Sequence, residues 1–139
     1  MREGYGIRFK LPELPPSVNS LYNVIFSLKR VELKPEVMMW KSKMKMYVPA
    51  WKPEKVGESG FLYFKMDVCA NLYHKNMNVR KFDVMNMEKV CVDMVCEKIG
   101  IDDKFITDCH TRKIHSDNEH VEVEVGFLDE DKTGWTKDE

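Results

Sequence analysis

Apolar and polar side chains alternate at the start of the chain and predict a β-strand over residues 5–11. The alternation stops at residues 11–22, LPELPPSVNSLY, where the prolines hold the backbone extended and predict a turn. Residues 22–33 match neither the strand period nor the helix period and receive no assignment. A helical period follows over residues 35–48, with Pro35 in the first turn and apolar residues spaced three and four apart.

Three strands and a second helix are predicted in the remainder of the chain. An apolar and aromatic run predicts a strand over residues 61–73. The second helix covers residues 84–99, because Asp83 suits its N-cap and Gly100 suits its C-terminal end. The last two strands are expected over residues 104–115 and 119–128.

This order of strand, helix, strand, helix, strand and strand predicts an α+β domain with a mixed sheet and two main helices. A chain of 139 residues buries one core, so we expect a single domain over residues 1–139. Residues 129–139 are expected to form a flexible acidic tail.

Several classes of protein are not favoured by the sequence. No apolar run approaches the ~20 residues needed to cross a bilayer, and the N-terminus lacks the apolar stretch of a signal peptide. We therefore expect no membrane partner and a cytoplasmic location. The four cysteines form no CxxC pair, and predict neither a disulfide framework nor a structural zinc site.

Charge is distributed unevenly along the chain, although 22 basic and 23 acidic residues give a net charge of -1. Residues 29–55 hold eight basic and three acidic residues, a net +5, whereas residues 116–139 hold two basic and nine acidic ones, a net -7. A concentrated basic segment is typical of a face that binds nucleic-acid phosphates. It is also typical of a solvated helix face beside an acidic tail, and charge alone favours this second interpretation.

The polar residues of the helix over residues 84–99 share one narrow stripe. At about 100° per residue, and with Asn86 as zero, Lys89 lies near ~300°, Asp93 near ~340° and Glu97 near ~20°. Most of the remaining circumference is apolar, which indicates a helix that is packed on several sides. The stripe must therefore face water, a partner or a site.

Acidic and basic residues also gather at the two ends of this helix. Arg80, Lys81 and Asp83 precede it, and Asp102 and Asp103 follow it. Carboxylates beside lysines suit phosphodiester chemistry, because the acids can hold a hydrated Mg²⁺ and an ammonium group offsets charge on the phosphate.

The same residues have a purely structural interpretation as well. Asp83 then caps the helix, Lys89 and Asp93 form an ion pair one helical turn apart, and the pair Asp102 and Asp103 forms a turn. His110 and His115 lie on opposite faces of a strand, so we expect no metal ion shared by the histidines of that region.

Two short motifs and a downstream lysine, in this order, resemble the RusA-like Holliday junction resolvase family. They are LPPSVNSLY at residues 14–22, RKFDVMNMEKVCVDMVCEKIGIDDKFI at residues 80–106, and Lys113. In that family a PPSxN turn follows the first strand, and a D-x-D-N-x-x-K-x-x-x-D motif is followed by a glycine, a D-D pair and a lysine. Residues 23–75 match only by the order of their elements.

The resemblance implies both an activity and the residues that carry it. Relatives are homodimeric, Mg²⁺-dependent endodeoxyribonucleases, with Mn²⁺ as an alternative ion, that make paired nicks across four-way junctions in DNA recombination and repair. They are often carried by phage or prophage. The implied catalytic residues are Asp83, Lys89 and Asp103, and the implied metal ligands are Asp83, Asp93, Asp102 and Asp103. The implied DNA contacts are Arg80, Lys81, Asn86, Lys113, Lys41, Lys43 and Lys45.

One position departs from the family pattern, because Met85 stands where the motif has its second acid. A thioether is a poor ligand for Mg²⁺, which takes oxygen donors. The nearest carboxylate, Glu88, lies about 200° around the helix from Asn86 and is a weak replacement. The chain is then either a nuclease with fewer carboxylates or a DNA-binding protein that has lost cleavage. A third alternative is an unrelated α+β interaction domain in which the matched residues are structural.

Overall fold

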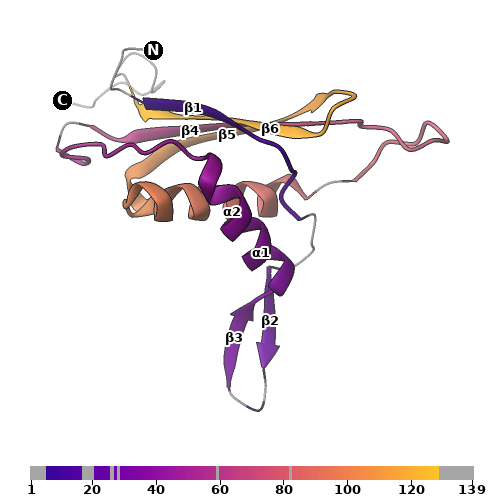
Figure 1. Cartoon of the computed structure of the whole chain (residues 1–139), viewed down its shortest axis with the longest axis horizontal. Coiled ribbons are helices and arrows are strands. Elements are labelled where there is room, and N and C mark those ends of the chain that lie inside the picture. The colour runs from indigo at the N-terminus through magenta and orange to yellow at the C-terminus, as the bar shows by residue number, and fades with distance from the viewer. Residues whose placement is uncertain are drawn as a thin grey trace, which may run out of the picture.

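A four-stranded sheet with two helices against one of its faces forms the body of the molecule (Figure 1). The structure is a computed structural model that describes residues 6–16, 21–25, 27, 29–58, 60–81 and 83–128. The strands are β1 (Gly6–Leu11), β2 (Tyr22–Ile25), β3 (Arg30–Leu33), β4 (Leu62–Ala70), β5 (Ile106–His115) and β6 (His120–Phe127). The helices are α1 (Pro35–Met44), α2 (Val84–Ile99) and the short 3-10 helices η2 (Lys45–Tyr47) and η3 (Asp103–Phe105).

The sheet is mixed, with the strand order β1-β6-β4-β5. β6 is antiparallel to both of its neighbours, whereas β4 and β5 are parallel and are connected through α2. A parallel pair needs such a crossover, and a helix is its usual form. The predicted α+β class, mixed sheet and two main helices are therefore confirmed.

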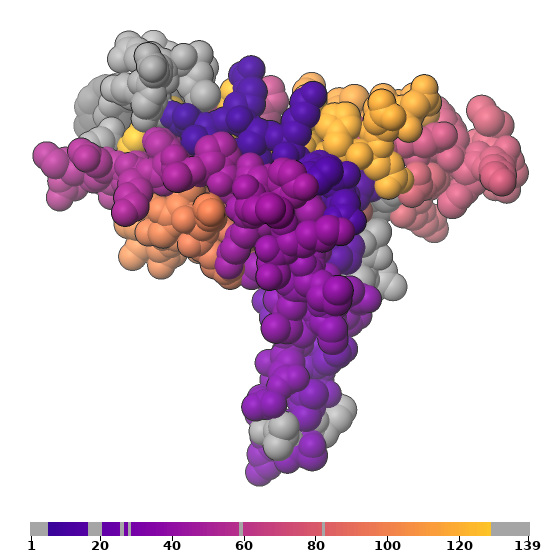
Figure 2. All heavy atoms as spheres, viewed as in Figure 1, coloured from indigo at the N-terminus to yellow at the C-terminus, as the bar shows by residue number. Residues whose placement is uncertain are grey.

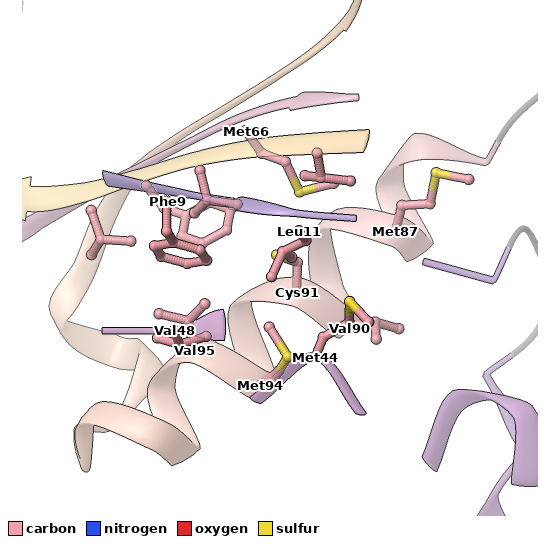
Figure 3. Close-up of a cluster of buried hydrophobic side chains, with 14 of the residues drawn as sticks. Phe9, Leu11, Met44, Val48, Met66, Met87, Val90, Cys91, Met94 and Val95 are labelled. Atoms are coloured by element: carbon pink, nitrogen blue, oxygen red, sulfur yellow. The ribbon is translucent and has the colours of Figure 1, made fainter. Parts of the chain in front are cut away.

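The core lies between the sheet and the two helices. Alternate residues of β4, β6 and β1 point toward the helices and are buried, as the strand period requires. The apolar face of α2 packs against them, and α1 adds Val37, Trp40 and Met44. Figure 3 shows Phe9, Leu11, Met66, Met87, Val90, Cys91, Met94 and Val95 in this cluster. Burial of this face fixes how α2 is rotated about its axis, and so decides which of its residues are left for a site.

Within residues 22–33, which the sequence left unassigned, β2 and β3 pair as an antiparallel hairpin. The hairpin projects from the body at the start of α1 (Figures 1 and 2). Val24 and Val31 pair across it, and each is 58% exposed. Because neither of its faces is consistently buried, the sequence carries no alternation there.

Residues 71–81 form a second projection, where the sequence predicts the end of a longer strand (Figure 2). The strand β4 ends at Ala70 because asparagine side chains then bind nearby backbone: Asn71 accepts from the amide of Tyr73 at 3.0 Å, and Asn76 accepts from that of Asn78 at 3.1 Å. Such turns compete with the sheet ladder.

The remaining boundaries differ from prediction by a few residues. The first helix becomes a 3-10 turn after Met44, and Asp103 begins a 3-10 helix before β5. None of the helices that the structure describes combines the length and the apolar character needed to cross a membrane. The predicted acidic tail at residues 129–139, and residues 17–20 of the N-terminal motif, lie outside the described residues.

Candidate active site

A hollow of about 300 Å³ lies between α2, η3 and β5. Its lining residues are Met85, Glu88, Lys89, Val92, Asp93, Asp103, Ile106 and Cys109. The five residues from α2 follow the spacing i, i+3, i+4, i+7 and i+8, which defines one face of a helix. Three carboxylates and one ammonium group therefore line one cavity. Of these four residues, Lys89, Asp93 and Asp103 were implied as catalytic or metal-binding residues by the family resemblance.

The N-cap of α2 sets the start of this face. The carboxylate of Asp83 accepts hydrogen bonds from the backbone amide and from the side-chain amide of Asn86, both at 3.1 Å. An N-cap of this kind stabilises a helix by about 1 kcal/mol. The structural interpretation of Asp83 is confirmed, and among the described residues neither Asp83 nor Asn86 lines the cavity.

The C-terminal end of α2 brings the second acidic motif to the cavity. Gly100 ends the helix with a φ of 74°, a backbone conformation that favours glycine. Asp102 then caps η3 by accepting from the amide of Lys104 at 2.9 Å. Asp103, the first residue of η3, lines the cavity. The two neighbouring aspartates thus have separate positions, one in a cap and one in the cavity.

The cavity carries negative charge that its single lysine does not balance. Burial raises the pKa of Asp93, and the nearby Asp103 raises it further, although Lys41 and Lys89 act in the opposite direction. Burial also raises the pKa of the Cys109 thiol to about 11, with added repulsion from Glu88, Asp108 and Asp103. Such a field favours a bound cation.

Lys89 lines the cavity. The ion pair with Asp93 that the structural interpretation offered is not among the ion pairs of the described residues, whose nitrogen–oxygen distances are 4.0 Å or less. Instead, the Lys89 ammonium group lies 5.4 Å from the centre of the Tyr22 ring. A cation over an aromatic face is held electrostatically. Tyr22 is the last residue of the N-terminal proline motif and the first of β2, so this contact connects the hairpin with the site.

Glu88 is the cavity residue that sequence reasoning undervalued. Its helical angle relative to Asn86 was correct, but the core fixes the rotation of α2 so that the face of Met85, Glu88 and Val92, rather than that of Asn86, lines the cavity. Glu88 therefore lies one turn from Met85 on the same face, and its carboxylate accepts a hydrogen bond from Thr111 of β5. The i, i+3 spacing of Met85 and Glu88 was the available signal.

The polar stripe of α2 is divided between two environments. Glu97 lies beyond the cavity and accepts hydrogen bonds from Lys41 and Lys45, each at 2.6 Å. Partial burial opposes ionisation of Glu97, but these two lysines lower its pKa overall. Lys43 pairs with Glu13 at 2.7 Å.

All three lysines that were expected to contact DNA from this region therefore form ion pairs within the chain. Only 15% of the Lys41 side chain is exposed. Other expected contacts are placed differently. Lys113 lies two and four residues from Thr111 and Cys109 on β5, and therefore on the same strand face as the cavity. Arg80 donates to the carbonyl of Asn71 at 2.8 Å in the second projection and lies 3.6 Å from the carboxylate of Glu119, so it is ion-paired as well. The neighbouring Lys81 is exposed.

Comparison with known proteins adds a family assignment to this geometry. Residues 15–126 match the family model described as Endodeoxyribonuclease RusA. The matched range contains the whole cavity, residues 15–22 of the N-terminal proline motif, and Lys113. The search of curated proteins returned no match to this chain.

Proposed function

The chain belongs to the RusA endodeoxyribonuclease family, and from that premise we propose that it is a metal-dependent nuclease that resolves four-way DNA junctions by paired nicks. The observation that carries the proposal is that Glu88, Asp93, Asp103 and Lys89 line one cavity. Negative and positive groups at one site match the needs of phosphodiester hydrolysis, where a cation and an ammonium group meet the charged phosphate.

The donor set of the cavity fits Mg²⁺ or Mn²⁺. All three acids offer carboxylate oxygens, the ligands that these ions take. In the described structure the three carboxylates are not all within 4.8 Å of one another, so their side chains rotate inward to share an ion. Burial and, after it, the nearby Asp103 raise the pKa of Asp93, and a bound cation would offset both. We assign the metal to Asp103, Asp93 and Glu88. A divalent ion bound there supplies an activated water and stabilises the leaving oxygen. Asp83 and Asp102, also implied by the resemblance, have their carboxylates engaged in caps.

Glu88 takes the place of the acid that the family has at Met85. Met85 is 82% exposed and lines the cavity, so an acid at its position would face the same space. A side chain three residues later leans toward the helix N-terminus and over that position. Glu88 is also one methylene longer than an aspartate, and Thr111 orients its carboxylate.

Lys89 and the other cations act on the DNA itself. The Lys89 ammonium group, held against the Tyr22 ring, meets the scissile phosphate and offsets the charge that develops on it. Lys113 extends the path of the DNA backbone along β5, and Arg80 and Lys81 extend it along the second projection. Lys43 and Lys45 stay predicted contacts at the far end of the path.

A homodimer completes the proposal, because a two-fold dimer presents two identical sites to the two like strands of a junction. The exposed Val24 and Val31 of the projecting hairpin supply an apolar surface for a second copy. Sedimentation velocity tests this: Val24→Glu is expected to give a monomer, whereas a native monomer would contradict it. A phage or prophage origin and a cytoplasmic location stay predictions.

The exposed Met85 favours one alternative, a junction-binding protein that has lost cleavage. A nicking assay on a synthetic four-way junction with Mg²⁺ or Mn²⁺ separates the two. The proposal expects paired nicks from the native protein, no nicks from Asp103→Asn, and binding by both. Native binding without nicks, with cutting restored by Met85→Asp, would support the alternative. Absence of any preference for junctions over duplex would contradict both.

A further inference from the structure

A second group of ligand-type side chains lies on the opposite face of the sheet from α2. Cys69 of β4 and His120 and Glu122 of β6 each place one ligand atom within 4.8 Å of the others'. Cys69 and His120 are direct partners in the antiparallel register of β4 and β6, and Glu122 is two residues further along β6. Because Val68 and Val121 point into the core, the strand period turns these three side chains away from the helices.

We propose that Cys69, His120 and Glu122 form a zinc site that is distinct from the nuclease cavity. A thiol, an imidazole and a carboxylate are the ligand types that Zn²⁺ takes, whereas Mg²⁺ is held by oxygen donors. Zinc bonds of ~2.0–2.3 Å keep tetrahedral ligands about 3.3–3.8 Å apart. Small side-chain rotations close the observed separations to that range, and a water completes the four ligands.

The imidazole of His120 is already oriented for this role. Its Nδ1 lies 3.0 Å from the carbonyl oxygen of Asn118. A carbonyl only accepts, so Nδ1 carries the hydrogen, and in the neutral ring Nε2 keeps its lone pair. A histidine that binds a metal through one ring nitrogen usually donates the hydrogen of the other nitrogen to a carbonyl or carboxylate, which fixes the orientation of the ring.

The thiol is sheltered and lies close to the carboxylate. Cys69 is 3% exposed, and its sulfur lies 3.9 Å from Oε2 of Glu122. When the ion binds, the sulfur–hydrogen bond breaks heterolytically, the proton leaves to solvent and the electron pair binds Zn²⁺, with no change in oxidation state.

The neighbouring charges leave the three ligands accessible to an ion. Asp67, which shares the face, is held in two 2.9 Å hydrogen bonds from Arg112. Lys10 approaches Glu122 only to 3.7 Å, in an exposed pair that an ion can replace. The bound ion would fasten the end of β4 to the start of β6, at the base of the projection formed by residues 71–81.

Cobalt substitution of the metal-free full chain tests the site directly. We expect a thiolate-to-cobalt charge-transfer band in the near ultraviolet that one Co²⁺ per chain accounts for, whatever the carboxylate cavity binds, and that one Zn²⁺ abolishes. Cys69→Ser removes the band, and His120→Gln weakens binding at least about tenfold. Zn²⁺ is also expected to raise the melting temperature of the native chain and of neither variant.

The matched controls are Cys109→Ser and Asp103→Asn, which alter the cavity on the other face. Both are expected to keep the band, so the zinc site and the nuclease activity are tested independently. Circular dichroism shows whether each variant is folded. A native spectrum without a thiolate band, a band that depends on Cys109, or a band that survives unchanged in both Cys69→Ser and His120→Gln would overturn the proposal.

Discussion

Asp93 and Glu97 lie one turn apart on α2, yet their surroundings are opposite. Asp93 is half-buried at the cavity, where burial and the nearby Asp103 raise its pKa. Glu97 is exposed and accepts hydrogen bonds from Lys41 and Lys45, which lower its pKa. The contrast separates two uses of a carboxylate. Asp93 has no ion pair with a lysine among the described residues and suits a metal ion, whereas Glu97 connects α1 to α2 through its ion pairs.

The difference arises from what packs beside each turn of the helix. The turn of Glu97 lies against the basic residues of α1 and η2, whereas the turn of Asp93 faces η3 and β5, which bring a further acid and a thiol. A polar stripe on one helix therefore does not define one site. The comparison predicts that substitutions at the two turns separate activity from stability.

The largest expected effect is on cleavage at the cavity. Asp103→Asn removes a proposed metal ligand and is expected to lower junction cleavage by more than about a hundredfold, beyond the loss typical of residues that only support a ligand. Glu97→Gln, the matched control on the same helix, is expected to retain cleavage. Single-turnover nicking rates measure both, and equal losses in the two variants would contradict the distinction.

Lys89 is expected to act on the reaction more than on binding. Lys89→Ala removes the cation that offsets charge on the phosphate, with an expected loss of about 10²–10³ in the cleavage rate. Junction affinity, measured by fluorescence anisotropy, should change far less. An affinity that falls as steeply as the rate would show instead that Lys89 is one of the general backbone contacts.

Stability without divalent ions is expected to change in opposite directions at the two turns. The pKa of Asp93 is raised on folding. The favourable contribution of Asp93 to the free energy of unfolding is therefore present below its ordinary pKa of 3.8, and it is lost as the pH rises through the raised pKa. Asp93→Asn should therefore stabilise the chain at neutral pH. The pKa of Glu97 is lowered on folding. The favourable contribution of Glu97 to the free energy of unfolding is therefore present above its ordinary pKa of 4.5, and it is lost as the pH falls through the lowered pKa.

Glu97→Gln should accordingly destabilise the chain at neutral pH, by about 0.2–1 kcal/mol because the pair is partly exposed. Urea unfolding at neutral pH and near pH 3 measures both variants, and each difference should shrink at the lower pH. Changes of the same sign in the two variants at neutral pH would contradict the comparison.

The smallest effect is expected in the salt dependence of DNA binding. Lys113→Ala should weaken binding to all DNA sequences and lower the salt slope by about one. Lys41→Ala is the control, because Glu97 already neutralises that ammonium group and covers it. Affinities over a series of salt concentrations compare the two, and an equal change in slope would place Lys41 on the DNA as well.

Local patterns were enough to predict the main fold. The periods and caps of the two helices, with Asp83 and Gly100 at the ends of α2, are properties of neighbouring residues, and the structure confirms them. The hairpin β2–β3 was not predicted, because Val24 and Val31 are both exposed and leave no alternation to detect.

The residues of the two sites could be predicted from the sequence only where their positions do not depend on tertiary packing. The cavity contains Lys89, Asp93 and Asp103, as the motif implied, but the place of Glu88 depends on how the core rotates α2 about its axis. Cys69 and His120 meet through the register of β4 and β6, and their spacing in the sequence contains no trace of it.

Mn²⁺ binding, followed by the electron paramagnetic resonance signal of the free ion, tests the central claim most directly. The account predicts that the native chain binds Mn²⁺ at the cavity, that Glu88→Gln and Asp103→Asn each weaken binding at least about tenfold, and that Glu97→Gln binds like the native chain. Native affinity retained in both cavity variants, or no binding by the native chain, would contradict the assignment of the metal to this cavity.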